Sequence, residues 1–254
     1  MSVCNGAQYL KESISSILAQ SYDDFEFLIV NDGSTDNSLE LAQRFGANDK
    51  RLRVLENKTN IGLTRSLNRA IGDARGEYVA RHDADDVALP DRFRQQVDWL
   101  DRESQCAVVG TNYLIIDADG GTIARGNPSH HTDNTAHTFA RGLNPLCHSS
   151  VMFRKAIVQN AGLYDEEYRY AQDYELWLRL IVRGYGMCNI PAKLQKIRHS
   201  GQEIAVKHRR ARWLCVIRIQ HRYLKHFWRS PHYIAAIFGR HLRFLLPASL
   251  TRTR

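Results

Sequence analysis

Two clusters of acidic side chains carry the clearest chemical signal in this sequence. Asp32 lies in an Asn-Asp-Gly-Ser segment, and Asp83, Asp85 and Asp86 fall within four consecutive residues. Carboxylates this close repel one another, and a hard divalent cation such as Mg²⁺ or Mn²⁺, which prefers oxygen ligands, would relieve that repulsion. Asn, Asp, Gly and Ser also form ordinary turns at strand ends, so the segment around Asp32 leaves both interpretations open.

Asp173 and two histidines are further candidates. Asp173 precedes a helical pattern, and the residues alone favour a helix N-cap for it. His148 could be a satisfied core histidine, and the residues alone leave the role of His199 open. The sequence contains no EF-hand loop, no GxGxxG and no GxxxxGK[ST], which leaves dinucleotide and P-loop phosphate binding unsupported. Five scattered cysteines without a CxxC argue against a zinc ribbon or a disulfide framework and favour a reducing compartment.

The elements that must position these residues alternate between strands and helices. An apolar run over 25–30 predicts a buried strand that ends near Asp32, and 78–80 predicts another that ends at the second acidic cluster. Between them, stripes such as Leu10, Ile14 and Ile17 predict helices packed on a sheet. Repeated β-α units predict an α/β fold, and such a sheet binds ligands beyond the carboxyl ends of its strands.

Beyond residue 107 the pattern is less regular and predicts a mixed arrangement. The expected elements are strands near 107–117, 147–153 and 187–190, and a helix over about 173–183.

The C-terminal residues hold the positive charge. Residues 193–254 contain 15 Lys and Arg and one acid, whereas residues 1–192 contain 20 basic and 26 acidic residues. The tail is helical in pattern and places Trp213, Phe227 and Trp228 among its charges, which predicts an amphipathic surface for an anionic membrane. Nucleic acid is the alternative polyanion, but the sequence carries no recognised nucleic-acid-binding motif.

Hydropathy indicates where the protein works. No run of 18 apolar residues is present and the chain opens without a signal-peptide pattern. We therefore expect no transmembrane helix and a cytoplasmic protein associated peripherally with the inner face of the membrane.

Five segments together resemble the family 2 glycosyltransferases. They are SVCNG (2–6), VNDGSTD (30–36), NIGL (60–63), GEYVARHDADD (76–86) and QDYELW (172–177). The resemblance covers about residues 1–200, in the family's order and spacing. It implies a GT-A fold, a Rossmann-like and mostly parallel sheet with helices on both faces. Residues 1–110 would form the nucleotide-sugar half and 111–200 the acceptor half, followed by the basic amphipathic helical tail at 201–254.

The resemblance also implies roles for individual residues. Asp32 would accept a hydrogen bond from the nucleotide base, Asp83 would contact the ribose, and Asp85 would hold the metal that bridges the diphosphate. Asp173 would be the general base that takes the proton of the acceptor hydroxyl, and attack opposite the leaving diphosphate would invert the anomeric carbon.

Other residues are assigned by the same resemblance. Cys4, Asn60 and Arg81 belong to the nucleotide-sugar site, and His199 to a late loop near the metal and diphosphate. Cys4 replaces the aromatic residue that in the family stacks on the base, and Gln172 replaces the acid that usually precedes the catalytic base.

We therefore predict an inverting, metal-dependent hexosyltransferase. It would use Mn²⁺ or Mg²⁺ and a nucleotide-diphosphate sugar, with UDP as the expected nucleotide. The acceptor would be a lipid-linked glycan or a polysaccharide in cell-surface glycan synthesis. Two alternatives remain: a catalytically weak homologue that binds nucleotide-sugars, and a nucleic-acid-binding protein that uses the basic tail.

Overall fold

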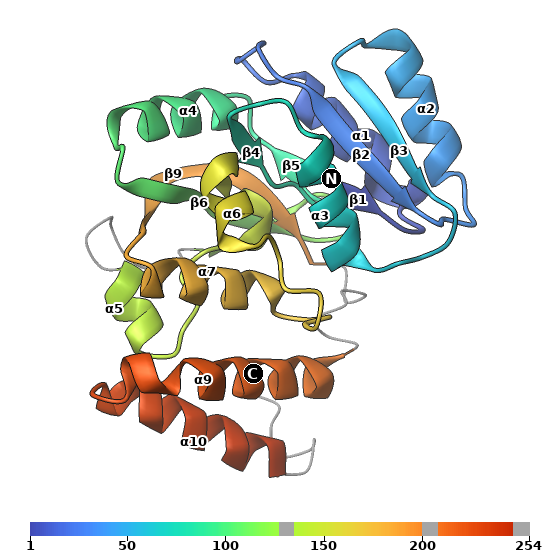
Figure 1. Ribbon diagram of the computed structural model, residues 1–254. Coiled ribbons are helices and arrows are strands. Elements are labelled where there is room, and N and C mark those ends of the chain that lie inside the picture. The colour runs from blue at the N-terminus through green and yellow to red at the C-terminus, as the bar shows by residue number, and fades with distance from the viewer. Residues whose placement is uncertain (127–134, 200–207, 246–254) are drawn as a thin grey trace.

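The computed structural model describes residues 1–126, 135–199 and 208–245, which form two β-sheets with helices around them (Figure 1). The strands are β1 (Ser2–Val3), β2 (Phe27–Asp32), β3 (Leu52–Asn57), β4 (Tyr78–Ala80), β5 (Val87–Ala88), β6 (Cys106–Ile116), β7 (Thr122–Gly126), β8 (Met152–Arg154) and β9 (Gly186–Arg198). The helices are α1 (Ala7–Leu18), α2 (Ser38–Asn48), α3 (Leu63–Asp73), α4 (Arg92–Arg102), α5 (Thr135–Ala140), α6 (Lys155–Ala161), α7 (Gln172–Val182), α9 (Arg209–Phe227) and α10 (Pro231–Leu245).

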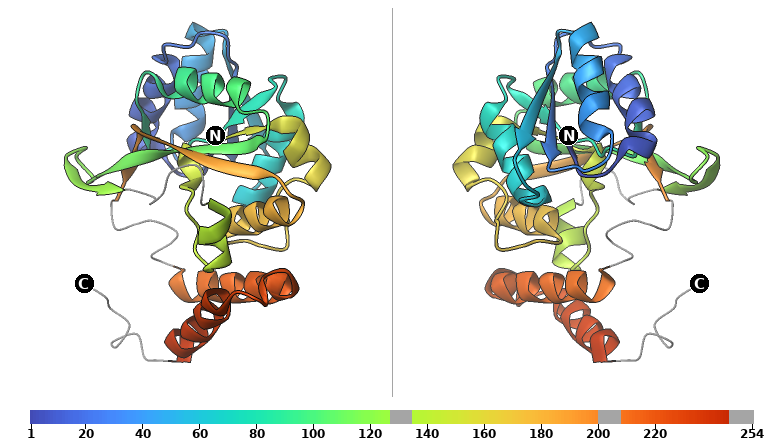
Figure 2. Two further views of the ribbon diagram at one scale, coloured as in Figure 1. Left: turned by 90° about the vertical axis from the view of Figure 1, so that its left-hand side faces the viewer. Right: turned by 90° about the vertical axis from the view of Figure 1, so that its right-hand side faces the viewer.

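The first sheet is parallel, with the order β1-β2-β3, as repeated β-α units predict. Every residue of β2 is buried. The predicted stripe of α1 faces the sheet, since Leu10, Ile14 and Ile17 have at most 1% of their surface exposed. Figure 2 shows α1 and α2 on one face of this sheet and α3 on the other. The prediction of an α/β core is confirmed.

The second sheet is mixed. Its order is β4-β8-β6-β9-β5, with β7 paired to β6, and the one parallel pair on this path is β6 with β9. The predicted strand at 187–190 is too short, because β9 continues to Arg198 along β6. Pro191 and the lysines that follow it hide this strand in the sequence. Pairing with β6 and β5 outweighs the low intrinsic preference of proline and lysine for strands.

The basic C-terminal residues form two helices at one end of the molecule, against α7 and α5 (Figures 1 and 2). Ile219 and Tyr223 of α9 belong to the same hydrophobic cluster as Trp177 of α7. Pro231 begins α10, where its missing N–H costs nothing. The predicted division at residue 200 therefore does not separate two hydrophobic cores. Across the parts of the chain that the structure describes, no helix is long and apolar enough to cross a membrane.

Candidate active site

The carboxyl ends of β1, β2 and β3 form the first rim of the site. Asp32, at the end of β2, is 2% exposed. Its Oδ1 accepts hydrogen bonds from Nδ2 of Asn57 (2.8 Å) and the backbone N of Ile61 (2.9 Å), and its Oδ2 accepts one from the backbone N of Gly62 (2.9 Å). A carboxylate has about four acceptor positions, so Asp32 retains capacity for a further donor such as a nucleotide base. That role stays a prediction.

Cys4 and Asn60 meet on this rim. Nδ2 of Asn60 lies 3.1 Å from Sγ of the exposed Cys4. Gly33 allows the backbone of Asn60 to pass close to the end of β2. Its φ is +66°, and a Cβ at this position would lie only 2.6 Å from the backbone N of Asn60. The structure thus brings together two residues that the sequence assigned to nucleotide-sugar binding.

The second acidic cluster follows β4 and is partly buried. Arg81, itself 4% exposed, forms an ion pair with Asp83 at 2.5 Å. Burial and the charge of Asp83 raise the pKa of Asp85 to about 6. Burial and the charges of its two neighbours raise the pKa of Asp86 to about 7. The local positive charge therefore does not neutralise this cluster, and a bound cation would do so.

Arg198, at the end of β9, holds the acidic loop in place. Its backbone N donates to Oδ1 of Asp86 (2.9 Å), and its Nε donates to the backbone carbonyl of Asp85 (2.9 Å). Its guanidinium also pairs with Glu12 at 2.5 Å and lies 4.4 Å from the ring centre of Tyr9 on α1. Sequence reasoning missed this residue, because the pairing of β9 with β5 that brings it here is invisible in a single sequence.

A buried arginine holds the backbone of the acidic loop from the interior of the protein. Arg92, the first residue of α4, has no exposed surface and donates to the carbonyl oxygens of Arg81 (2.6 Å) and Val151 (3.2 Å) and to Oε1 of Gln195 (2.9 Å). Burial lowers its pKa to about 9. His82 points into the same interior, where burial lowers its pKa well below the usual value. These residues fix the backbone of the loop that carries the acidic side chains.

Asp173 lies in the first turn of α7. Ala171 occupies the cap position, with a left-handed φ of 56°, so the N-cap interpretation of Asp173 is wrong. Nδ2 of Asn144 donates to its Oδ2 at 2.9 Å. Burial raises the pKa of Asp173, and the charge of Arg212 on α9 partly opposes the rise. A raised pKa makes a carboxylate a stronger base, which suits the role of a general base.

Tyr164 connects the two acidic regions. Its hydroxyl lies 2.9 Å from Nε2 of His148, whose ring packs edge-on against both Tyr164 and Trp177. Burial raises the pKa of Tyr164; the charge of Arg81 opposes the rise, and the charges of Asp173 and Asp83 add to it. Asp83 and Asp173, 90 positions apart in the chain, therefore act on one hydroxyl.

His199 directly follows Arg198, the last residue of β9. It is exposed, and its backbone N donates to the carbonyl of Ile116 at 2.7 Å. Within residues 1–126, 135–199 and 208–245, no group of three or more His, Cys, Asp and Glu side chains is arranged to hold a metal. The assignments of Asp85 and His199 as ligands remain predictions.

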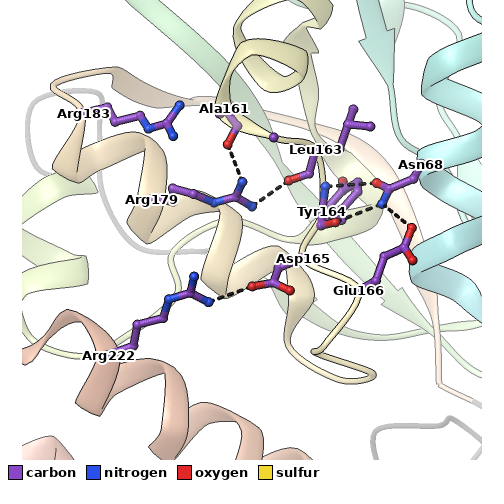
Figure 3. A pocket seen from close by; sticks show the side chains of 10 residues that line it. Asn68, Ala161, Leu163, Tyr164, Asp165, Glu166, Arg179, Arg183 and Arg222 are labelled. Atoms are coloured by element: carbon purple, nitrogen blue, oxygen red, sulfur yellow. Dashed lines mark hydrogen bonds and ion pairs between the residues drawn. The ribbon is translucent and has the colours of Figure 1, made fainter.

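A separate pocket of about 530 Å³ lies between α3, α9 and the loop from α6 to α7 (Figure 3). Arg179 points to the carbonyl oxygens of Ala161 and Leu163, and Arg222 donates to Oδ2 of Asp165 at 2.7 Å. The ion pair between Arg222 and Asp165 attaches α9 to the loop between α6 and α7. Because the arginines of this pocket already have partners within the protein, we assign it no catalytic role.

Comparison with known proteins identifies the family. The sequence profile of glycosyl transferase family 2 matches residues 1–162. EpsE of Bacillus subtilis, named as a glycosyltransferase, is 36% identical over 201 residues, which cover 78% of this chain and 71% of EpsE. The amylovoran biosynthesis glycosyltransferase AmsE of Erwinia amylovora is 32% identical over 200 residues, which cover 79% of this chain and 74% of AmsE.

Solved structures share the fold. TarS of S. aureus in complex with UDP-GlcNAc superposes with a TM-score of 0.74 at 18% identity, covering 96% of this chain and 71% of TarS. The mannosyltransferase PcManGT of Pyrobaculum calidifontis, in complex with GDP-Man and Mn²⁺, gives 0.69 at 18% identity, covering 96% of this chain and 68% of PcManGT. At this identity the likeness establishes the fold alone. This chain therefore belongs to glycosyltransferase family 2 and is a glycosyltransferase with the GT-A fold.

Proposed function

We propose that this protein is an inverting, divalent-metal-dependent hexosyltransferase. It takes a sugar from a nucleotide-diphosphate donor, with UDP as the expected nucleotide. It passes that sugar to a lipid-linked or polysaccharide acceptor of the cell surface while held at the cytosolic face of a membrane. TarS with UDP-GlcNAc supports the donor class, and the amylovoran biosynthesis role of AmsE supports the acceptor class.

The observation that carries this proposal is the position of Tyr164, whose hydroxyl lies 2.9 Å from Nε2 of His148 and whose pKa is raised by the charges of both Asp83 and Asp173. The first aspartate belongs to the loop proposed for the donor, and the second is the proposed base for the acceptor. A transferase must hold these two groups around one reaction centre, because the new bond forms between their ligands. A protein that only bound nucleotide-sugars would not need a buried carboxylate of raised pKa at the second position.

The chemistry of the acidic loop supports the proposal of a divalent cation. Asp85 carries a carboxylate whose pKa burial and Asp83 raise, and oxygen ligands of this kind suit Mg²⁺ or Mn²⁺. When bound there, the ion would neutralise the diphosphate and make it a better leaving group. PcManGT, solved with Mn²⁺, supports this choice.

Asp173 performs the proton transfer. Its carboxylate takes the proton of the acceptor hydroxyl as the oxygen attacks the anomeric carbon. The bond from that carbon to the diphosphate breaks on the opposite face, so the configuration inverts. The raised pKa of Asp173 strengthens it as a base, and the charge of Arg212 partly opposes that rise.

The hairpin of α9 and α10 supports attachment to a membrane. Trp228, Phe238 and Leu242 are 58%, 69% and 62% exposed, and residues 208–245 contain no acidic side chain. Exposed apolar groups on a cationic surface suit an anionic bilayer. The sequence predicted that Phe227 enters the lipid, but its ring stacks on that of Tyr233 with the ring centres 4.8 Å apart. We therefore expect the three exposed side chains named above to make the contact with lipid.

A panel of nucleotide-sugars with Mn²⁺ or Mg²⁺ tests the proposal, scored for donor binding and slow hydrolysis. We expect one donor to bind and to be transferred. Asp173→Asn keeps the shape of the side chain but cannot accept a proton, so kcat should fall about 10²-fold or more with donor affinity nearly unchanged. Equal losses in donor binding and turnover would contradict the base assignment. Binding without hydrolysis by the wild type would favour the catalytically weak homologue.

A further inference from the structure

The side chain of Asn144 contacts the proposed base directly and takes no part in the steps described above. Its Nδ2 donates to Oδ2 of Asp173 at 2.9 Å. Its Oδ1 accepts a hydrogen bond from the backbone N of Leu146 at 3.1 Å. A backbone N–H can only donate, so the amide oxygen must face Leu146 and the amide nitrogen must face Asp173. The asparagine therefore presents a donor to the carboxylate in one fixed orientation.

The segment that carries this asparagine, residues 141–146, is held by the hairpin of α9 and α10. The carbonyl oxygen of Gly142 accepts hydrogen bonds from Nη2 of Arg240 (2.8 Å) and Nε2 of Gln220 (3.4 Å). The φ of Gly142 is +72°, and a Cβ there would lie 2.7 Å from both the Cβ of Ala236 and Nε2 of Gln220. The segment thus packs on the hairpin without room for a side chain.

The charge state of Asp173 depends on the same surroundings. Burial raises its pKa, whereas the charge of Arg212 on α9 and the hydrogen bonds from the backbone N of Tyr174 and from Asn144 lower it. Tyr164 also faces this carboxylate, whose charge raises the pKa of the tyrosine. A hydrogen bond to a carboxylate favours the ionised form, and a base must be ionised to take a proton.

We propose that Asn144 is a positioning residue for the base Asp173, and that the hairpin of α9 and α10 holds Asn144 in place through residues 141–146. The hydrogen bond fixes the rotation of the carboxylate, so that it meets the acceptor hydroxyl in one orientation. This inference rests on the proposed function, because it takes Asp173 as the base. It gives the hairpin a role in the reaction besides the proposed contact with lipid.

Titration of the Asp173 carboxyl by NMR tests the contact without any substrate. The full chain is labelled isotopically at the carboxyl carbon of aspartate, and the signal missing from Asp173→Asn identifies the base. We expect Asn144→Ala to raise the pKa of Asp173, because a donor to the ionised form is lost, and Asn144→Asp to raise it more. Asn48→Ala is the matched control, since this exposed asparagine on α2 donates only to the carbonyl of Arg44 (2.7 Å) and should leave that pKa unchanged.

A pair of glycine variants tests the part played by the hairpin. Gly142→Ala changes no charge, but its Cβ would push the segment away from α9 and α10, so the pKa of Asp173 should again rise. Gly184→Ala introduces the same backbone strain, at a φ of +87°, where no atom would lie within 4 Å of the new Cβ. That control should leave the pKa of Asp173 unchanged. An equal response of the two variants would overturn the role of the hairpin.

Hydrolysis of a UDP-sugar connects the contact to turnover. In Asn144→Ala, kcat should fall about tenfold or more with donor affinity unchanged, and the acidic limb of its pH profile should move to higher pH. The same substitution should cost nothing further in an Asp173→Asn background. Thermal unfolding checks that each variant folds.

Three results would overturn the positioning role of Asn144. They are an unchanged pKa of Asp173 in Asn144→Ala, an unchanged kcat, and an equal loss in donor binding. If Asp173→Asn slows turnover while Asn144→Ala does not, this inference alone fails. An unchanged turnover in Asp173→Asn would instead contradict the proposed function on which the inference rests.

Discussion

Tyr223→Phe tests whether α9 is an integral part of the catalytic domain. The hydroxyl of Tyr223 on α9 donates to Oε1 of Glu175 on α7 at 2.7 Å. Glu175 has no exposed surface, and its Oε2 accepts a hydrogen bond from Nη2 of Arg179 at 2.8 Å. The substitution keeps the ring and removes one hydrogen bond to a buried carboxylate, two residues from the proposed base.

The expected cost follows from that geometry. A hydrogen bond to a charged group contributes about 1.5–3 kcal/mol, and Arg179 continues to compensate Glu175, so we expect a loss of about 2 kcal/mol. For a chain of this size each kcal/mol shifts the midpoint of thermal unfolding by about 2–4 °C, so the midpoint should fall by about 4–8 °C. Circular dichroism at 222 nm would follow the transition.

Tyr22→Phe is the matched control. The guanidinium of Arg94 lies 4.9 Å from the ring centre of Tyr22, and its hydroxyl makes no hydrogen bond to another residue that the structure describes. Losing that hydroxyl should move the midpoint by less than about 2 °C. If Tyr223→Phe lowers the midpoint no more than this control, the hydrogen bond does not hold α9 against α7. The conclusion that α9 is an integral part of the catalytic domain would then be wrong.

Three further predictions concern the acidic loop, the rim and the hairpin. In EDTA the unfolding midpoint of the wild type, measured relative to that of the double variant Asp85→Asn/Asp86→Asn, should fall as pH rises from about 4 to about 7; this comparison cancels the opposite contribution of His82, whose folded pKa is lowered. Asp85 and Asp86 have folded pKa values above the unfolded 3.8, so unfolding releases protons in this window. Added Mn²⁺ should reverse that fall, and Asp85→Asn should weaken both effects. Gly33→Ala should cost more than about 1 kcal/mol, as measured by denaturant unfolding, and should weaken donor binding, whereas Gly72→Ala, in open space on α3, should stabilise. Trp228→Ser/Phe238→Ser should reduce sedimentation with anionic vesicles, and Ile123→Ser, 57% exposed on β7, should not.

Local patterns sufficed for the first sheet and its loops. The stripe of Leu10, Ile14 and Ile17 predicts the buried face of α1, and the structure buries all three. Asp32 ends β2 of the parallel sheet, at the edge where such a sheet binds ligands, and the second acidic cluster directly follows β4 of the mixed sheet. Such features depend on neighbours within a few positions, so one sequence is enough to predict them.

The supports of the site could not be predicted in the same way. Arg92 contacts Val151 and Gln195 across 59 and 103 positions, and Arg198 contacts Glu12 across 186. Nothing in the local pattern distinguishes these arginines from surface ones. Their partners are set by the pairing of β8 and β9 with β6, β4 and β5, which depends on the whole sheet.

Helix α9 links the base, the buried core and the proposed membrane contact in one rigid element. Its 19 residues span about 28 Å, with Arg212 near Asp173 at its start and Trp228 just beyond its end. If the hairpin met the membrane only at the Trp228 end, the base would lie about that far from the headgroups. Phe238 and Leu242 lie four residues apart, on one side of α10, and therefore favour a hairpin that lies along the surface. That orientation would bring the base close to the headgroups, where a lipid-linked acceptor would present its sugar.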